Sequence, residues 1–118
     1  MITLVLGAST KPERYSNIAI KMLQDYDQKV LAVGLRKGDV NGTPILSEWP
    51  NETPDTITLY LNPARQEAYK KQILHSGAQR VIFNPGTENP SFRSELDRAG
   101  IETVEACTLV MLRTNQYL

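Results

Sequence analysis

Residues 2–9, ITLVLGAS, constrain more strongly than any other stretch what this chain can fold into. Their β-branched and apolar side chains form a nearly continuous run, which is typical of a strand buried on both faces, as in a parallel sheet. The run stops at Gly7, and glycine lets the backbone turn sharply and approach another group closely. A strand that passes through small residues into a helix predicts a phosphate site, because the exposed amides at such a turn attract an anion.

Four further stretches have the composition of strands. We expect them at residues 30–33, 56–61, 80–83 and 101–104, where β-branched and large apolar side chains dominate. Five strands that alternate with helical segments predict an α/β protein with a Rossmann-like, doubly wound, five-stranded parallel sheet. At 118 residues, the chain is expected to form one three-layer domain over residues 1–118.

Helical patterns separate these strands. Apolar residues recur at helical spacing from residue 18 to residue 26, with Ser16 as the expected N-cap. Asn62-Pro63 and Asn89-Pro90 each predict an N-cap followed by a proline at the first helical position, and the two helices are expected to end near Gly77 and Gly100. Residues 35–55 are expected to be irregular, because they combine an Asn-Gly turn with two X-Pro steps. A short docking helix is expected in residues 107–118.

The composition excludes several classes of partner. Thirteen basic residues balance thirteen acidic ones, so net charge favours neither nucleic acid nor an anionic membrane. No apolar run approaches the roughly 20 residues that span a bilayer, and the N-terminus lacks the basic start and cleavage site of a signal peptide. The single cysteine, Cys107, excludes internal disulfides and suits a reducing cytoplasm, where we expect the protein. With one cysteine and one histidine, a structural zinc site is not expected.

The loops after the strands form the candidate site, because doubly wound sheets bind ligands beyond the carboxyl ends of their strands. The first two loops carry cations, neutral donors and small residues, which together suit a phosphate. The predicted ligand-binding residues of these two loops are Gly7, Ala8, Ser9, Lys11, Arg14, Ser16, Asn17, Gly34, Arg36 and Lys37. Those of the later loops are Asn62, Pro63, Asn84, Pro85, Gly86 and Thr87. Cations on polar loops can also be simply solvated, and the residue types alone leave that alternative open.

The sequence also bears on which nucleotide would bind. A nicotinamide fingerprint needs G-x-G-x-x-G after the first strand and an acidic residue at the end of the second. Here Gly7 is followed by Ala8-Ser9-Thr10-Lys11-Pro12, and residues 34–37 are GLRK with no carboxylate. Basic residues at this place suit a ribose that carries an extra phosphate, so the pattern disfavours NAD and leaves NADP or coenzyme A.

Signals of catalysis are sparse. The chain has no G-x-S-x-G elbow, no Walker A loop and no paired-carboxylate signature. His75 is expected at a helix end away from the ligand edge, and Glu88 in the first turn of the following helix, where the dipole favours a carboxylate. Cys107 follows the fifth strand on the ligand side, either as a buried cysteine or as a reactive thiol. We therefore expect no complete catalytic machinery.

The chain resembles the small stand-alone CoA-binding proteins, whose Rossmann-like domain is also the N-terminal domain of the succinyl-CoA synthetase α subunit. The similarity covers nearly the whole sequence. Its most specific block is VLGAS at residues 5–9 followed by KPERYSN at residues 11–17. Three weaker blocks agree in order and spacing: VNGTPI at residues 40–45, NPGTE at residues 84–88, and Gly100-Ile101 leading to Cys107.

The resemblance implies coenzyme A or an acyl-CoA as the ligand. It implies that the loop Gly7-Ala8-Ser9 holds the CoA diphosphate with help from Arg14, Ser16 and Asn17, and that Lys37 reaches the adenosine-phosphate end. The pantetheine arm would run past Asn62-Pro63 toward residues 84–87. Synthetase chemistry is not implied, because the phosphohistidine domain of the α subunit has no counterpart in this sequence.

Two alternatives to a non-catalytic CoA-binding module stay open. One is a regulatory domain that senses an NAD(P)-type nucleotide together with a partner chain. The other is a thiol-exchange protein in which Cys107 reacts with the disulfide of CoA. The expected partner in each case is a small-molecule nucleotide, and the sequence leaves a protein partner or a homodimer open.

Overall fold

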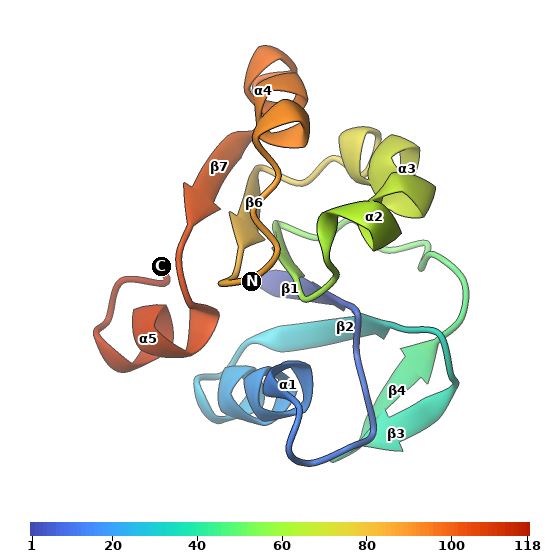
Figure 1. Cartoon of the computed structure of the whole chain (residues 1–118). Helices are drawn as coiled ribbons and strands as arrows, with labels where there is room; N and C mark the ends of the chain where they lie inside the picture. The colour runs from blue at the N-terminus through green and yellow to red at the C-terminus, as the bar shows by residue number, and fades with distance from the viewer.

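A computed structural model describes residues 1–118 (Figure 1). All five expected strands lie in one sheet and run parallel to one another. They are β1 (Ile2–Leu6), β2 (Lys29–Val33), β5 (Thr56–Leu59), β6 (Arg80–Phe83) and β7 (Glu102–Glu105). The spatial order of these five strands is β2-β1-β5-β6-β7, and every neighbouring pair is parallel. Their carboxyl ends therefore meet at one edge of the sheet, as the sequence predicts.

The expectation of a five-stranded sheet is wrong, because the sheet has seven strands. The segment expected to be irregular contains β3 (Gly38–Val40) and β4 (Thr43–Leu46), which form an antiparallel hairpin and join the sheet through a parallel pairing of β4 with β2. Asn41 and Gly42 both have positive φ, the conformation of a tight hairpin turn. Pro44 precedes the pairing of β4 with β2, which begins at Ile45, so its missing N–H removes no hydrogen bond from that ladder.

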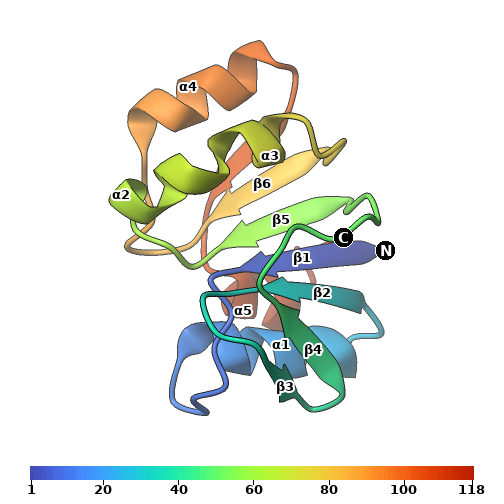
Figure 2. The ribbon, with the colours of Figure 1, turned by 90° about the vertical axis from the view of Figure 1, so that its right-hand side faces the viewer.

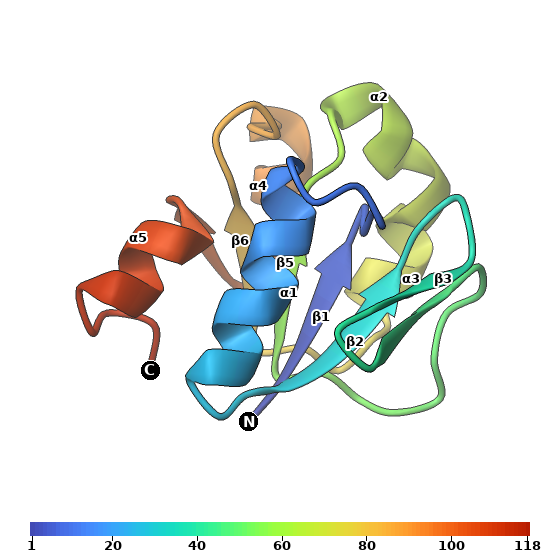
Figure 3. The same ribbon diagram turned by 90° about the horizontal axis from the view of Figure 1, so that it is seen from below.

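Helices cover both faces of the sheet (Figure 2). α1 (Tyr15–Asp25) and α5 (Thr108–Arg113) lie on one face, as the view from below also shows (Figure 3). α2 (Pro63–Gln66), α3 (Lys70–Leu74) and α4 (Pro90–Arg98) lie on the other. The expected docking helix in the tail is confirmed as α5. None of the helices is long and apolar enough to cross a membrane.

The helix starts test the capping predictions individually. Both Asn-Pro pairs are confirmed, since the Asn62 side chain accepts a hydrogen bond from the Arg65 N–H and the Asn89 side chain accepts one from the Phe92 N–H. Ser16 is not an N-cap: α1 begins at Tyr15, and Ser16 is buried in its first turn. The helix expected from residue 62 to about residue 75 is interrupted by a 3₁₀ turn, η1 (Glu67–Tyr69), between α2 and α3.

The core consists of two apolar layers, one on each face of the sheet. Leu4, Leu6 and Ile57 pack with Ile73 of α3 and Phe92 of α4. On the opposite face, residues of β1 and β2 pack with Ile20 and Leu23 of α1 and with Met111 and Leu112 of α5. The central strands are buried on both faces, which explains why β1 and β2 are mostly apolar and why β5 combines apolar residues with buried threonines.

The C-terminal segment is tied to the amino ends of the strands. The Tyr117 hydroxyl lies 2.6 Å from the Thr3 hydroxyl, and both are buried. Arg80 donates to the Tyr117 carbonyl at 2.7 Å, and its guanidinium carbon lies 4.6 Å from the centre of the Tyr117 ring. These contacts hold the tail at the edge of the sheet opposite to the candidate site.

Phe92 provides a test of the layer beneath α4. It is fully buried and packs edge-to-face on Phe83, with ring centres 6.2 Å apart. Phe92→Ala should lower the free energy of unfolding by about 3–5 kcal/mol in urea denaturation, because it leaves a cavity in a closed layer. Val110→Ala, at a half-exposed position on α5, is the control, and equal losses in the two variants would contradict this packing.

Candidate functional site

A cleft of about 830 Å³ lies beyond the carboxyl ends of β1, β2, β5 and β6. Most of the sequence-predicted site residues line it, although they come from four separate loops. They are Gly7, Ala8, Ser9, Lys11, Arg14, Ser16, Gly34, Arg36, Asn62, Pro85, Gly86 and Thr87. Asn17, Lys37, Pro63 and Asn84 are not part of the lining.

The turns after β1 and β2 interlock at the floor of the cleft. The N–H groups of Gly7 and Ala8 both donate to the Val33 carbonyl, at 2.9 and 3.0 Å. Gly7 has a φ of 98°, and a Cβ at Gly34 would lie 2.4 Å from the Ala8 carbonyl oxygen. The two glycines therefore shape the turn, and the amides of Gly7 and Ala8 are already used inside the protein.

Backbone N–H groups that are free to bind a ligand begin at Ser9, the residue after Ala8. The N–H groups of Ser9 and Thr10 make no hydrogen bond within the protein. The Asn17 side chain donates to the Ser9 carbonyl at 3.0 Å, and the Ser9 hydroxyl accepts from the Lys11 N–H at 3.1 Å. Asn17 thus fixes the loop from behind without lining the cleft, and the first turn of α1 presents Ser16 beside it.

All charged side chains that line the cleft are cations. They are Lys11, Arg14, Arg36 and Arg65, and none of them takes part in an ion pair. The lining contains no aspartate or glutamate. In a chain of zero net charge, this one-sided placement gives the cleft a positive potential, which attracts an anionic ligand.

The loop after β6 forms one wall of the cleft, which we call the β6 wall (Pro85, Gly86 and Thr87). Asn84 lies beneath it and is buried. Its side chain donates to the Thr58 hydroxyl and the Leu59 carbonyl and accepts from the Thr108 N–H, at 2.6–2.9 Å. The amide of Asn84 therefore joins the loop after β6 to the end of strand β5 and to the start of α5, and both of its polar atoms are already bonded.

Glu88 does not lie in the first turn of α4, as the sequence suggested, because Asn89 is the N-cap and follows it. Its carboxylate instead accepts a hydrogen bond from the Gly86 N–H at 2.8 Å. The Thr87 hydroxyl and N–H both donate to the Asn84 carbonyl. The N–H groups of Gly86 and Thr87 and the Thr87 hydroxyl are thus all bonded inside the protein, which fixes the β6 wall at the edge of the cleft.

Several lining residues were missed by sequence reasoning. Arg65 and Tyr69 come from α2 and η1, and Tyr15 and Leu35 lie at the mouth, where they are 70% and 74% exposed. Arg65 follows the Asn62-Pro63 start by two residues, so its place in the first turn of a helix at the ligand edge was a usable signal. Tyr15 and Leu35 each adjoin a predicted cation, and no pattern distinguished them from solvated loop residues.

Tyr60 lines the cleft with its ring while its hydroxyl is buried. That hydroxyl makes no hydrogen bond of ordinary geometry, and its neighbours Thr58 and Thr108 bond to each other at 2.8 Å. Burial raises the pKa of Tyr60, and the nearby threonine hydroxyls offset this only in part.

The two remaining candidates for chemistry lie outside the cleft lining. Cys107 is half-buried at the start of α5, in the electrostatic neighbourhood of Tyr60. His75 ends α3 and is exposed, with its Nδ1 2.9 Å from the Lys71 carbonyl. The helix-end position expected for His75 is confirmed.

The chain is similar over most of its length to proteins with a CoA binding domain. The model of that family matches residues 2–113. A solved structure of an uncharacterized protein is 42% identical, with a TM-score of 0.95 over 98% of this chain and 97% of that one. A hypothetical protein from Pyrococcus horikoshii OT3 is 26% identical, with a TM-score of 0.87 over 95% of this chain and 81% of that one.

A protein from Thermus thermophilus, 21% identical, has the same fold, with a TM-score of 0.87 over 98% of this chain and 90% of that one. No functionally curated protein matches the sequence.

Gly34→Ala tests the interlocked turns. The new Cβ would clash with the backbone oxygen of Ala8, which cannot rotate away, so we expect a loss of about 1–3 kcal/mol in unfolding free energy by urea denaturation. Gly38→Ala is the matched control, because its Cβ would also meet an atom at 2.4 Å, but that atom is a methyl group of the Thr10 side chain, which can turn away. A loss at Gly34 no larger than that at Gly38 would contradict the interlock.

Tyr60→Phe tests the buried hydroxyl. Because the hydroxyl has no partner, the variant should be at least as stable as the wild type at neutral pH. Burial raises the pKa of Tyr60 on folding, so as the pH rises above about 10 the unfolded state loses its phenol proton before the folded state does. The free energy of unfolding of the wild type therefore falls between the unfolded and the folded pKa. The variant should therefore lose less stability in alkaline denaturation, and a clear loss of stability at neutral pH would show that the hydroxyl is bonded.

Proposed function

Because the chain belongs to the CoA-binding domain family, we propose that it binds coenzyme A or an acyl-CoA in the cleft beyond β1, β2, β5 and β6. The observation that carries this proposal is the charge of the cleft: four cations and no carboxylate. Coenzyme A presents a diphosphate and a 3′-phosphate, which together carry about four negative charges near neutral pH. The charge of the ligand thus matches that of the lining.

The diphosphate would lie on the loop after β1. There the unused N–H groups of Ser9 and Thr10, the Ser16 side chain and the Arg14 guanidinium can meet phosphate oxygens. Hydrogen bonds between cations and phosphate are shorter and stronger than neutral ones. The role of Gly7 and Ala8 in this proposal is to shape the turn, since their own amides are used by Val33.

The two ends of the ligand would lie on opposite sides of this loop. Arg36 lines the cleft after β2 and suits the 3′-phosphate, with Lys37 just outside the lining. The pantetheine arm would extend along Asn62 and the β6 wall. In this arrangement the ligand lies beyond the carboxyl ends of the strands, as in Rossmann-like domains. Residues 1–118 then act as one CoA-binding domain.

The protein would act as a binding module rather than as an enzyme. The cleft lining holds no carboxylate, no histidine and no cysteine, so it offers neither a carboxylate nor an imidazole for general acid–base catalysis and no thiol nucleophile beside the ligand. Cys107 lies outside the lining, and the proposal therefore assigns it no part in thiol exchange.

NADP is the second candidate ligand. Its diphosphate and 2′-phosphate carry the same total charge as the diphosphate and 3′-phosphate of coenzyme A. Arg36 follows β2, and the cleft has no carboxylate that could bind free ribose hydroxyls, as NAD would require.

A thermal-shift titration with CoA, dephospho-CoA, NAD and NADP separates the two candidate ligands, since a ligand that binds only the folded state raises the melting midpoint. CoA should give the largest shift and dephospho-CoA a smaller one, whereas a shift with NADP alone would replace the proposal by the nucleotide-sensing alternative.

Arg14→Ala tests the phosphate contacts. The variant should weaken CoA binding by about 10- to 100-fold in isothermal titration calorimetry, because it removes a charge-assisted hydrogen bond worth about 1.5–3 kcal/mol. Arg98→Ala, an exposed arginine at the end of α4, removes the same charge away from the cleft. Equal affinities in the two variants would exclude the loop after β1 as the phosphate site.

A further inference from the structure

Gln66 is a fully buried polar residue at the end of α2, next to the cleft but not in its lining. Its Nε2 donates to the Leu61 carbonyl and to the Thr87 carbonyl, each at 2.8 Å. Leu61 and Thr87 both line the cleft, from the loops after β5 and β6. One side-chain amide thus joins two loops that are separate in the sequence.

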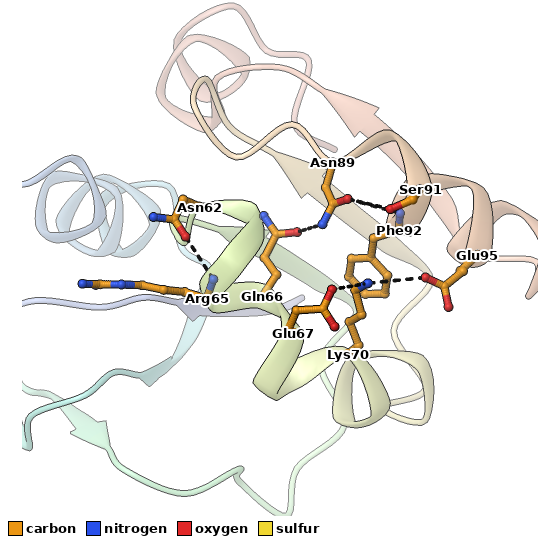
Figure 4. Close-up of polar contacts among 9 residues, drawn as sticks. All are labelled: Asn62, Arg65, Gln66, Glu67, Lys70, Asn89, Ser91, Phe92 and Glu95. Carbon is orange, nitrogen blue, oxygen red and sulfur yellow. Dashed lines mark hydrogen bonds and ion pairs between the residues drawn. The ribbon is translucent and has the colours of Figure 1, made fainter.

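The other end of the same amide reaches α4. Asn89 Nδ2 donates to Gln66 Oε1 at 2.9 Å, and Asn89 Oδ1 accepts from the Ser91 hydroxyl at 3.1 Å and from the Phe92 N–H at 3.4 Å (Figure 4). Both acceptors of Nε2 are carbonyls, so the amide of Gln66 can be oriented in only one way. The chain of bonds leaves neither of the two buried amides free to rotate.

We propose that Gln66 is the positioning residue that sets the width of the cleft between Leu61 and the β6 wall, and thereby its fit to the pantetheine arm. This inference rests on the proposed function, because it concerns the arm of the same ligand. Both backbone polar groups of Thr87 are bonded inside the protein: its N–H donates to the Asn84 carbonyl, and its carbonyl accepts from the Gln66 side chain. Without Gln66, the β6 wall loses its link to the loop after β5.

Gln66 is the last residue of α2 and is buried, whereas Lys70 is the first residue of α3 and its side chain is partly exposed. Lys70 Nζ lies 2.7 Å from a Glu67 oxygen, 3.6 Å from a Glu95 oxygen and 5.3 Å from the centre of the Phe92 ring. The hydrogen bond with Glu67 raises the pKa of Lys70, so the ammonium stays charged at neutral pH. Lys70 therefore connects α3 to α4, as Gln66 connects α2 to the start of α4 (Figure 4), but Lys70 does not line the cleft.

This pairing supplies a matched control. Gln66→Met keeps the length of the side chain and removes all three hydrogen bonds, two of which hold cleft loops. Lys70→Met keeps the packing on Phe92 and removes the ion pairs that lie away from the cleft. Both variants weaken the attachment of α2 and α3 to α4, and only the first releases Leu61 and Thr87.

The experiment measures the affinity gained from the arm. Adenosine 3′,5′-bisphosphate carries the nucleotide and 3′-phosphate but no pantetheine, so the ratio of its Kd to that of CoA reports the contribution of the arm and its phosphate. In calorimetric titrations, Gln66→Met should lower this ratio about tenfold, with a smaller change in the Kd of the bisphosphate. Lys70→Met should leave the ratio at the wild-type value, even if its melting midpoint falls as far as that of Gln66→Met.

The other outcomes are distinct. An unchanged ratio in Gln66→Met, or an equal weakening of both ligands, overturns the positioning role while leaving CoA binding in place. A wild-type protein that binds neither ligand removes the proposed function and this inference with it. If Gln66→Met does not fold, Gln66→Asn decides: it keeps a side-chain amide but shortens it by one methylene, so the amide cannot reach Leu61, Thr87 and Asn89 together. A wild-type ratio in that variant overturns the inference.

Discussion

The site depends on the interlock between the turns after β1 and β2. The Val33 carbonyl accepts from two successive amides, Gly7 and Ala8, and the Ala8 carbonyl approaches Gly34 too closely for any side chain there. This contact fixes where the chain leaves the sheet. It directs the loop that carries Ser9, Thr10 and Arg14 over the sheet edge and leads it into α1, so the cations of the cleft are placed by backbone geometry rather than by partners of their own.

The rigid part of the cleft lies on the other side. There Asn84 and Gln66 use buried amides to join segments that the sequence separates, and the backbone N–H groups of the β6 wall are bonded inside the protein. Buried amides that are fully bonded specify one arrangement, because each unmade bond would cost about 1–3 kcal/mol. The cleft therefore combines an exposed, cationic lip with an internally bonded wall, a division that suits a ligand with a charged nucleotide and an uncharged arm.

Much of this could be predicted from the sequence, for identifiable reasons. The central strands are rich in β-branched and apolar residues and the Asn-Pro pairs are strong helix starts, so strand positions and the caps at Asn62 and Asn89 followed from local physics. The β3–β4 hairpin did not, because Pro44 and the Asn-Gly turn indicate a loop, and its buried apolar residues are Val40 and Ile45. Asn84 could be placed at the ligand edge, but which of its neighbours would consume its amide depends on tertiary contacts. Arg65 lies in the first turn after Asn62-Pro63 and could have been placed at the ligand edge, whereas the break after α2, which carries Tyr69, has no sequence signal that we can identify.

The proposed binding mode depends on one contact, that of the CoA diphosphate with the loop after β1. A crystal structure of the protein grown with CoA tests it most directly. We expect diphosphate oxygens within hydrogen-bond distance of the Ser9 and Thr10 N–H groups, with Arg14 on the same phosphates and the arm between Leu61 and the β6 wall. A CoA molecule bound elsewhere, or one whose diphosphate contacts none of these groups, would contradict the account.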